Sequence, residues 1–92
     1  MEFTEEDKQA LQRMGNKELE VRQIAASLNE TKYSVNGESI TAERAVEILG
    51  REVFLEGLMY STFHRLSDRN GLNGEVVYFD SSEYYYSVNL LR

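Results

Sequence analysis

Residues 51–66, REVFLEGLMYSTFHRL, carry the most regular apolar pattern in the chain and are therefore the strongest indication of its fold. Their apolar and small polar positions recur at i, i+3, i+4, i+7, i+8 and i+11, the spacing of one face of an α-helix. These positions are Leu55, Leu58, Met59, Thr62, Phe63 and Leu66. The pattern predicts a long amphipathic helix that begins at Arg51 and lies at the centre of the core.

Two shorter helices are predicted before this one. Thr4 is placed to cap the first, with carboxylates in its first turn, and Gly15 is placed to end it, so we expect helix over about residues 5–14. Asn16 is placed to cap the second helix. The apolar stripe of that helix consists of Val21, Ile24, Ala25 and Leu28.

The segment YSVNGESI, residues 33–40, predicts a β-hairpin. Its Asn36-Gly37 pair tolerates the two positive φ angles of a type I′ turn. The register that gathers the apolar side chains on one face pairs Tyr33 with Ile40, Ser34 with Ser39 and Val35 with Glu38. Thr41 then caps a further helix that Gly50 ends, and its apolar positions are Ala42, Ala45, Val46 and Leu49.

A second hairpin is predicted near the C-terminus, after a turn-rich segment at residues 69–74. A four-residue loop at 80–83 avoids placing Asp80 directly across from Glu83. The resulting pairs on one face are Phe79 with Tyr84, Val77 with Tyr86 and Glu75 with Val88. On the other face, Tyr78 is paired with Tyr85 and Val76 with Ser87.

These elements predict an α+β fold in one domain that spans residues 1–92. At 92 residues the chain is long enough for one modest core. Its composition, 41% hydrophobic and 28% charged, is ordinary for a globular protein and too apolar for a disordered one.

The net charge of -6 disfavours direct binding to nucleic acid or to anionic lipid, because both carry negative charge themselves. The lack of cysteine removes disulfides and thiolate chemistry, and it fits a reducing cytoplasm. The acidic start of the chain is unlike a signal peptide, and no apolar run approaches a membrane span. We therefore expect a cytoplasmic protein that uses no cofactor.

Few residues of this chain suggest metal binding or catalysis. His64 and Asp68 are four positions apart on the predicted central helix, so both could reach one metal ion from the same face. Two ligands do not make a metal site, and Glu56 or Glu83 would have to supply the others. A mild helical His-Asp pair is the alternative that we prefer. Ser61 precedes His64 by three residues but lacks the glycine-flanked turn of a catalytic serine, so we expect it on the helix surface.

The second hairpin supplies the candidate contact surface. Strand alternation turns Tyr78 and Tyr85 away from the core, beside acidic side chains, and exposed tyrosine beside carboxylate suits a protein interface. The predicted contact residues are Glu75, Tyr78, Asp80, Glu83 and Tyr85. The alternative, that the tyrosines only stiffen an antiparallel sheet, stays open.

Residues 33–58, from Tyr33-Ser34-Val35 through Leu49-Gly50-Arg51 to Gly57-Leu58, are similar to small proteins of phages and prophages of Gram-positive bacteria. Tyr60–Arg65 resembles the same group. Many such small acidic proteins are anti-defence factors, including anti-CRISPR proteins. The resemblance therefore implies a protein without enzymatic activity that binds a host CRISPR effector nuclease and blocks the loading of nucleic acid.

The sequence allows two modes of inhibition and an alternative function. The negative charge is spread along the chain, so inhibition by mimicry of nucleic acid and inhibition by docking elsewhere on the nuclease are both allowed. The alternative function is that of an accessory or regulatory phage protein that acts by self-association or by binding another protein, as a monomer or a homodimer.

Overall fold

The computed structural model describes residues 1–64 and 66–81. Within these residues an antiparallel four-stranded sheet has the strand order β2-β1-β4-β3. The elements are, in chain order, α1 (Glu5–Arg13), α2 (Glu18–Ser27), β1 (Lys32–Val35), β2 (Glu38–Ile40), α3 (Ala42–Leu49), α4 (Arg51–His64), β3 (Leu66–Asn70) and β4 (Val76–Asp80). Segregation of the helices from an antiparallel sheet confirms the predicted α+β class.

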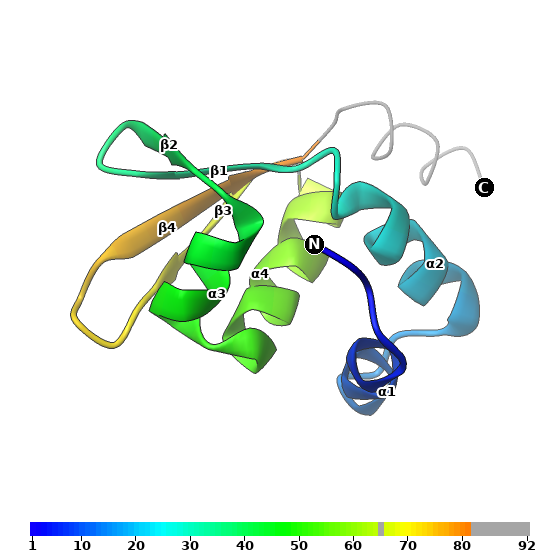
Figure 1. Cartoon of the computed structure of the whole chain (residues 1–92). Helices are drawn as coiled ribbons and strands as arrows, with labels where there is room; N and C mark the ends of the chain where they lie inside the picture. Colours follow the sequence, from blue (N-terminus) through cyan, green and yellow to red (C-terminus); the bar gives the residue numbers. More distant parts are fainter. Residues whose placement is uncertain (65, 82–92) are drawn as a thin grey trace.

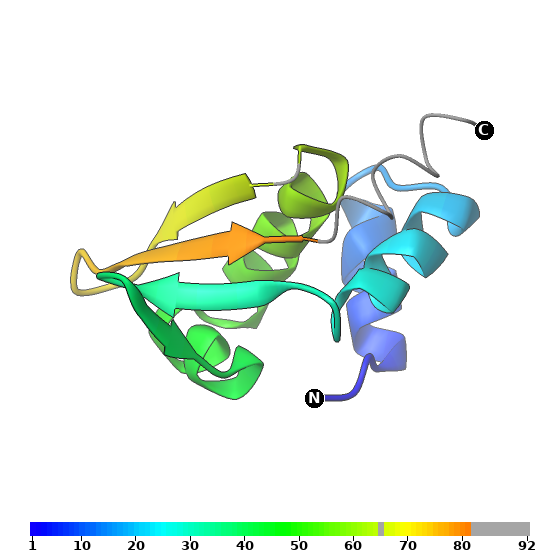
Figure 2. The same cartoon turned by 90° about the horizontal axis from the view of Figure 1, so that it is seen from above.

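The helices lie on one side of the sheet. Figure 1 shows α3 and α4 beneath the strands, with α1 and α2 on the side of α4 that is away from α3. Figure 2, which is seen from above, shows the strands in front of α3 and α4. The sheet therefore has an inner face that is covered by helices and an outer face that the described helices leave uncovered.

The core is centred on three aromatic rings between the sheet and α4. Tyr33 from β1, Phe54 from α4 and Phe79 from β4 have ring centroids 5.3 to 5.7 Å apart, and the Tyr33–Phe79 pair is edge to face. The phenol of Tyr33 donates a hydrogen bond to the Leu28 carbonyl at 3.1 Å, so its polar end is satisfied inside the core. Val77 is fully buried beside these rings.

Two of the three predicted helix caps and the predicted turn at Asn36-Gly37 are confirmed. Thr4 and Asp7 form a capping box at the start of α1, and the Thr41 hydroxyl accepts a hydrogen bond from the Arg44 amide at 3.1 Å. Asn36 and Gly37 have φ angles of 52° and 80°, as a type I′ turn requires. The predicted β1–β2 register is also confirmed.

The predicted cap of the second helix is wrong. Lys17, one residue later than expected, holds the N-cap position of α2, and its amide donates to the Glu20 carboxylate at 2.8 Å. Asn16 instead donates its side-chain amide to the Leu11 carbonyl at 2.9 Å and contacts the Met59 sulfur. A tertiary contact with α4 has therefore replaced the local cap.

The central helix is shorter than its apolar pattern predicts. It ends at His64, and Leu66 lies in β3, where its side chain is 58% exposed. Asp68 is also in β3, so the predicted helical pair with His64 is wrong. Beyond His64, the helical spacing was supported by one apolar residue, Leu66. The pairing of β3 with β4 along five residues outweighs that weak helical preference.

The predicted C-terminal hairpin has the wrong partner strand. β4 occupies an inner position in the sheet, with β1 along one edge and β3 along the other, so both of its edges are used. The hairpin in this part of the chain is β3–β4. The turn expected at residues 69–74 is present after Asn70, but it joins β3 to β4 and does not follow a helix. The predicted pairing partners at residues 84–88 lie outside the described residues.

Candidate functional site

The outer face of the sheet is the candidate functional site, and β4 positions its central side chain. Alternation along β4 turns Val77 and Phe79 into the core, where both are fully buried. The same alternation turns Tyr78 and Asp80 outward, and the Tyr78 side chain is 43% exposed although its strand is an inner one. A large ring is thus presented on a strand that is paired along both edges.

Two rows of side chains cross this face because directly opposed residues of antiparallel strands point the same way. The first row contains Asp68 of β3, Tyr78 of β4 and Ser34 of β1, and it continues to Ser39 of β2. The second row contains Leu66, Asp80 and Lys32. We call these seven residues the Tyr78 face.

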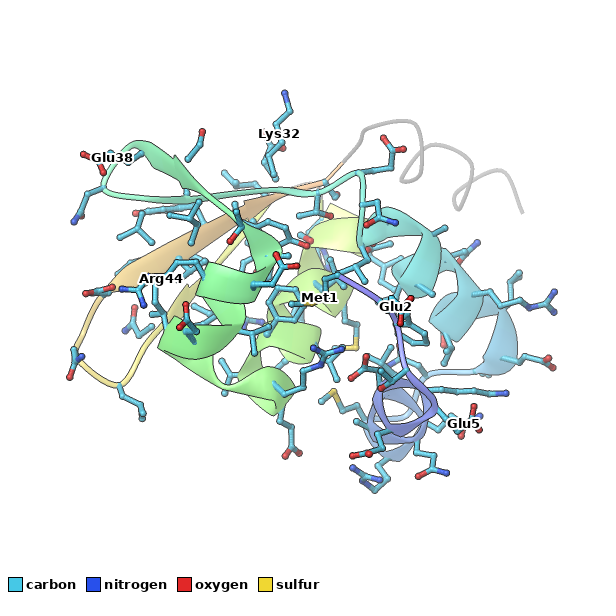
Figure 3. All side chains as sticks on the ribbon, in the orientation of Figure 1. Met1, Glu2, Glu5, Lys32, Glu38 and Arg44 are labelled. Carbon is cyan, nitrogen blue, oxygen red and sulfur yellow. The ribbon has the colours of Figure 1, made fainter. Side chains whose placement is uncertain are left out.

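The Tyr78 face carries two carboxylates and one ammonium group. Asp68 and Asp80 are exposed on neighbouring strands, and Lys32 stands directly across from Asp80. Figure 3 shows Lys32 rising from the sheet on the side away from the helices. The face is therefore mildly acidic toward β3 and locally balanced toward β1.

The structure brings together only part of the predicted contact surface. Tyr78 and Asp80 share the Tyr78 face, whereas Glu75 lies on the helix side and lines a cavity of about 250 Å³ with Arg44 and Ile48. Glu83 and Tyr85 lie outside the described residues. Leu66 and Asp68 also belong to the Tyr78 face, but the sequence did not predict this. Leu66 was assigned to the apolar face of the central helix, and Asp68 was assigned to a helical pair with His64.

A second group of side chains flanks the edge of β3. The guanidinium carbon of Arg69 lies 4.4 Å from the centroid of the Tyr60 ring, and its Nε is 3.4 Å from Glu56 Oε1, an ion pair without hydrogen-bond geometry. The His64 ring stacks on Tyr60 with centroids 6.0 Å apart. An open cavity of about 440 Å³ is lined by Tyr60, His64 and Arg69 of this group, together with Leu66, Ser67 and Asp68.

The candidates for catalysis and metal binding are separated in the structure. Ser61 is fully buried, and its hydroxyl donates to the Leu58 carbonyl at 3.0 Å, so its predicted surface position is wrong. His64 is exposed on the next turn of α4. Within residues 1–64 and 66–81, no group of three or more His, Cys, Asp or Glu side chains is placed to hold a metal ion.

A cavity of about 700 Å³ lies between α1 and the start of α4, and the ion pair of Asp7 with Arg51 lines it. Arg51 Nε donates to Asp7 Oδ1 at 2.8 Å, its Nη2 contacts the other carboxylate oxygen, and Nη2 also donates to the Glu2 carbonyl at 3.1 Å. Burial raises the pKa of Asp7, but hydrogen bonds and charge from Arg51, with hydrogen bonds from Thr4, outweigh burial and hold that pKa below its ordinary value.

Each partner of this ion pair is therefore kept charged. The hydrogen bond to Asp7 raises the pKa of Arg51. The pair links α1 to α4, and each charged group finds its hydrogen-bond partners within the protein. We therefore assign the pair a structural role.

No match to this chain was found among protein-family models, curated proteins or solved structures. In the part of the chain that the structure describes, no helix combines the length and the apolar character needed to cross a membrane.

Proposed function

We propose that this protein is a binding protein without enzymatic activity that inhibits a host defence nuclease in the bacterial cytoplasm. The nuclease is a CRISPR effector, as the resemblance of residues 33–58 to small phage proteins suggests, and inhibition consists of blocking the groove that holds its nucleic acid. Grooves of this kind are lined with Lys and Arg, so an acidic protein is attracted to them. The net charge of -6 supports this mode of action.

The observation that carries the proposal is the Tyr78 face. Its central ring is 43% exposed and its edge residue Leu66 is 58% exposed, on a sheet face that the described helices leave uncovered. Aromatic anchors with polar neighbours are typical of the energetic centre of protein interfaces. Asp68 and Asp80 add negative charge to this face, and a groove that binds phosphate is positively charged and attracts it.

Competition with nucleic acid tests the proposal. A purified CRISPR effector nuclease is incubated with the protein before or after its guide RNA is added, and cleavage of target DNA is followed. We expect inhibition that is strong when the protein is added first and weak when the guide is already bound. Equal cleavage with and without a stoichiometric excess of the protein would contradict the proposal.

A matched pair of double variants places the contact. Asp68→Lys with Asp80→Lys reverses charge on the Tyr78 face, whereas Glu18→Lys with Glu47→Lys makes the same change in net charge on exposed positions of α2 and α3. We expect the first pair to abolish inhibition and the second to weaken it only slightly. Equal effects of the two pairs would mean that net charge, and not this face, directs binding.

A second candidate function is self-association or binding to another phage protein, which the position of β3 favours. β3 is last in the strand order, so one of its edges pairs with no other strand among the described residues. Such an edge is a template for strand pairing, although Asp68 and Arg69 are the kind of charged residues that discourage it. A concentration-dependent dimer on a sizing column that Leu66→Lys dissociates would support this function over the first.

A further inference from the structure

We infer that the Tyr78 face receives a single arginine side chain of the partner, whose guanidinium group stacks on the Tyr78 ring and pairs with the Asp68 carboxylate. This rests on the function proposed above for the identity of the partner, and it adds the chemical group that the partner must supply. The geometry that carries the inference involves three strands.

Tyr78 has a carboxylate on one side and a small hydroxyl side chain on the other. Asp68 is directly opposed to it on β3, and side chains so opposed have Cβ atoms about 5 Å apart. Ser34 is directly opposed on β1, and Ser39 extends the row on β2. Of the two side chains that the described strands place directly opposite Tyr78, one is the carboxylate and the other is the small Ser34, so a group laid on the ring reaches Asp68.

The protein itself already holds one arginine in this way. The guanidinium carbon of Arg69 lies 4.4 Å from the centroid of the Tyr60 ring. Arg69 also forms an ion pair with Glu56, which precedes Tyr60 by four residues on α4. Tyr78 with Asp68 presents the same two groups, a phenol ring beside a carboxylate, on the outer face of the sheet. Among residues 1–64 and 66–81, Tyr60 is the tyrosine that carries an arginine over its ring.

The position of Lys32 selects Asp68 over Asp80 as the carboxylate partner. Lys32 is directly opposed to Asp80, so a second cation near Asp80 meets like charge. Asp68 is on β3, and Tyr78 separates it from β1 and Lys32. Arg69, the next residue after Asp68, points to the helix side. The guanidinium is therefore directed toward the β3 side of the ring.

Arginine fits this arrangement better than lysine. A guanidinium is planar, stacks on an aromatic face and donates two parallel hydrogen bonds to one carboxylate, whereas an ammonium is a compact point charge that keeps its water. Arginines that contact phosphates are abundant in nucleic-acid grooves. One such residue taken up by Tyr78 and Asp68 would be withdrawn from the phosphate backbone.

A peptide titration tests the inference without the nuclease. Two blocked pentapeptides, identical except for a central arginine or lysine, are titrated into the full-length protein while NMR follows the Tyr78 ring and the Asp68 amide. We expect both signals to shift and the arginine peptide to bind several-fold more tightly than the lysine peptide. Tyr78→Phe keeps the ring and should keep the preference, whereas Tyr78→Leu and Asp68→Asn should each remove it.

Glu47→Gln on α3 is the matched control for the loss of one acidic group, and it should leave the preference unchanged. Equal affinity for the two peptides, or shifts confined to other residues, would overturn the inference. If Tyr78→Leu and Asp68→Asn, with wild-type amide spectra elsewhere, inhibit the nuclease as well as wild type does, the arginine site is refuted and the proposed function stands. If the peptide preference holds but no nuclease is inhibited, the function fails and the site stands.

Discussion

At the scale of single residues, the ion pair of Asp7 with Arg51 makes stability depend on pH. The Asp7 side chain is 3% exposed and that of Arg51 is 38% exposed, so water partly solvates one partner only. Because the folded pKa of Asp7 is lowered, the stability from this carboxylate is present above the unfolded pKa of about 3.9 and is lost as pH falls through the folded value.

Arg51→Met should therefore reduce the free energy of unfolding at pH 7 by about 2 kcal/mol, because it leaves the Asp7 carboxylate buried without its cation. We expect this loss to shrink near pH 3, where Asp7 becomes protonated in the variant. Urea unfolding followed by circular dichroism at the two pH values measures it. A loss of the same size at both would assign the effect to packing of the arginine stem.

A second prediction at this scale concerns the buried hydroxyls of Ser27 and Thr62, whose oxygens are 2.7 Å apart. Both residues are fully buried, one on α2 and the other on α4. Thr62→Val should cost about 1 kcal/mol, because it leaves one buried hydroxyl without this partner. Adding Ser27→Ala should cost less in that background than in wild type. Additive losses in a double-mutant cycle of chemical denaturation would show that the two hydroxyls do not depend on each other.

At the scale of elements, Gly57 sets how closely α4 approaches the sheet. A Cβ atom at this position would lie 2.6 Å from Phe79 Cζ and 2.7 Å from Phe79 Cε1, and that ring is fully buried. Glycine in a helix interior ordinarily costs about 1 kcal/mol relative to alanine. Its presence here is explained by the close contact of helix and sheet.

Gly57→Ala should accordingly destabilise the fold by about 1–2 kcal/mol, because overpacking against Phe79 exceeds the gain in helix propensity. Thermal unfolding measures the change. Phe79→Leu removes the clashing ring atoms, so the alanine should be less harmful in that background than in wild type. A stabilising effect of Gly57→Ala in the wild-type background would contradict the close approach.

The boundary between α4 and β3 also belongs to this scale. The amphipathic pattern predicted the helix and its start at Arg51, and both are confirmed. The same pattern could not predict its end, because β3 has the sequence LSDRN, which is mostly polar and has no apolar alternation. Its strand conformation depends on pairing with β4, so the residues that complete the Tyr78 face gave no local signal.

At the scale of the whole molecule, charge and shape should contribute differently to binding. Attraction between the protein and a basic groove is screened over about 10 Å at 0.1 M salt and over a shorter length at higher salt. Raising salt from about 0.1 to 0.4 M should slow association with the nuclease severalfold, and it should change dissociation less. Surface plasmon resonance measures both rates.

Tyr78→Leu should have the opposite signature in the same experiment. The loss of a buried aromatic anchor should raise the dissociation rate and leave the salt dependence of association unchanged. Association that does not respond to salt would show that the net charge of -6 has no part in recognition.

Several features of this protein follow from the backbone and side-chain preferences of a few neighbouring residues. Thr4 and Thr41 identified helix starts, Asn36-Gly37 identified a turn, and alternation correctly turned Tyr78 away from the core. These outcomes depend on contacts within one turn or one strand. The class of fold was therefore predictable, and so was the central residue of the candidate site.

The order of the strands in the sheet could not be predicted from local patterns. β4 lies between β1 and β3, although β1 is more than forty residues earlier in the chain. The pairing uses backbone hydrogen bonds that almost any residue supplies, and the choice of partner follows from burying Phe79 against Tyr33 and Phe54. Burial of these three rings is a contact between distant parts of the chain that no local pattern shows. For the same reason, only the pairing of β3 with β4 brings Asp68 beside Tyr78.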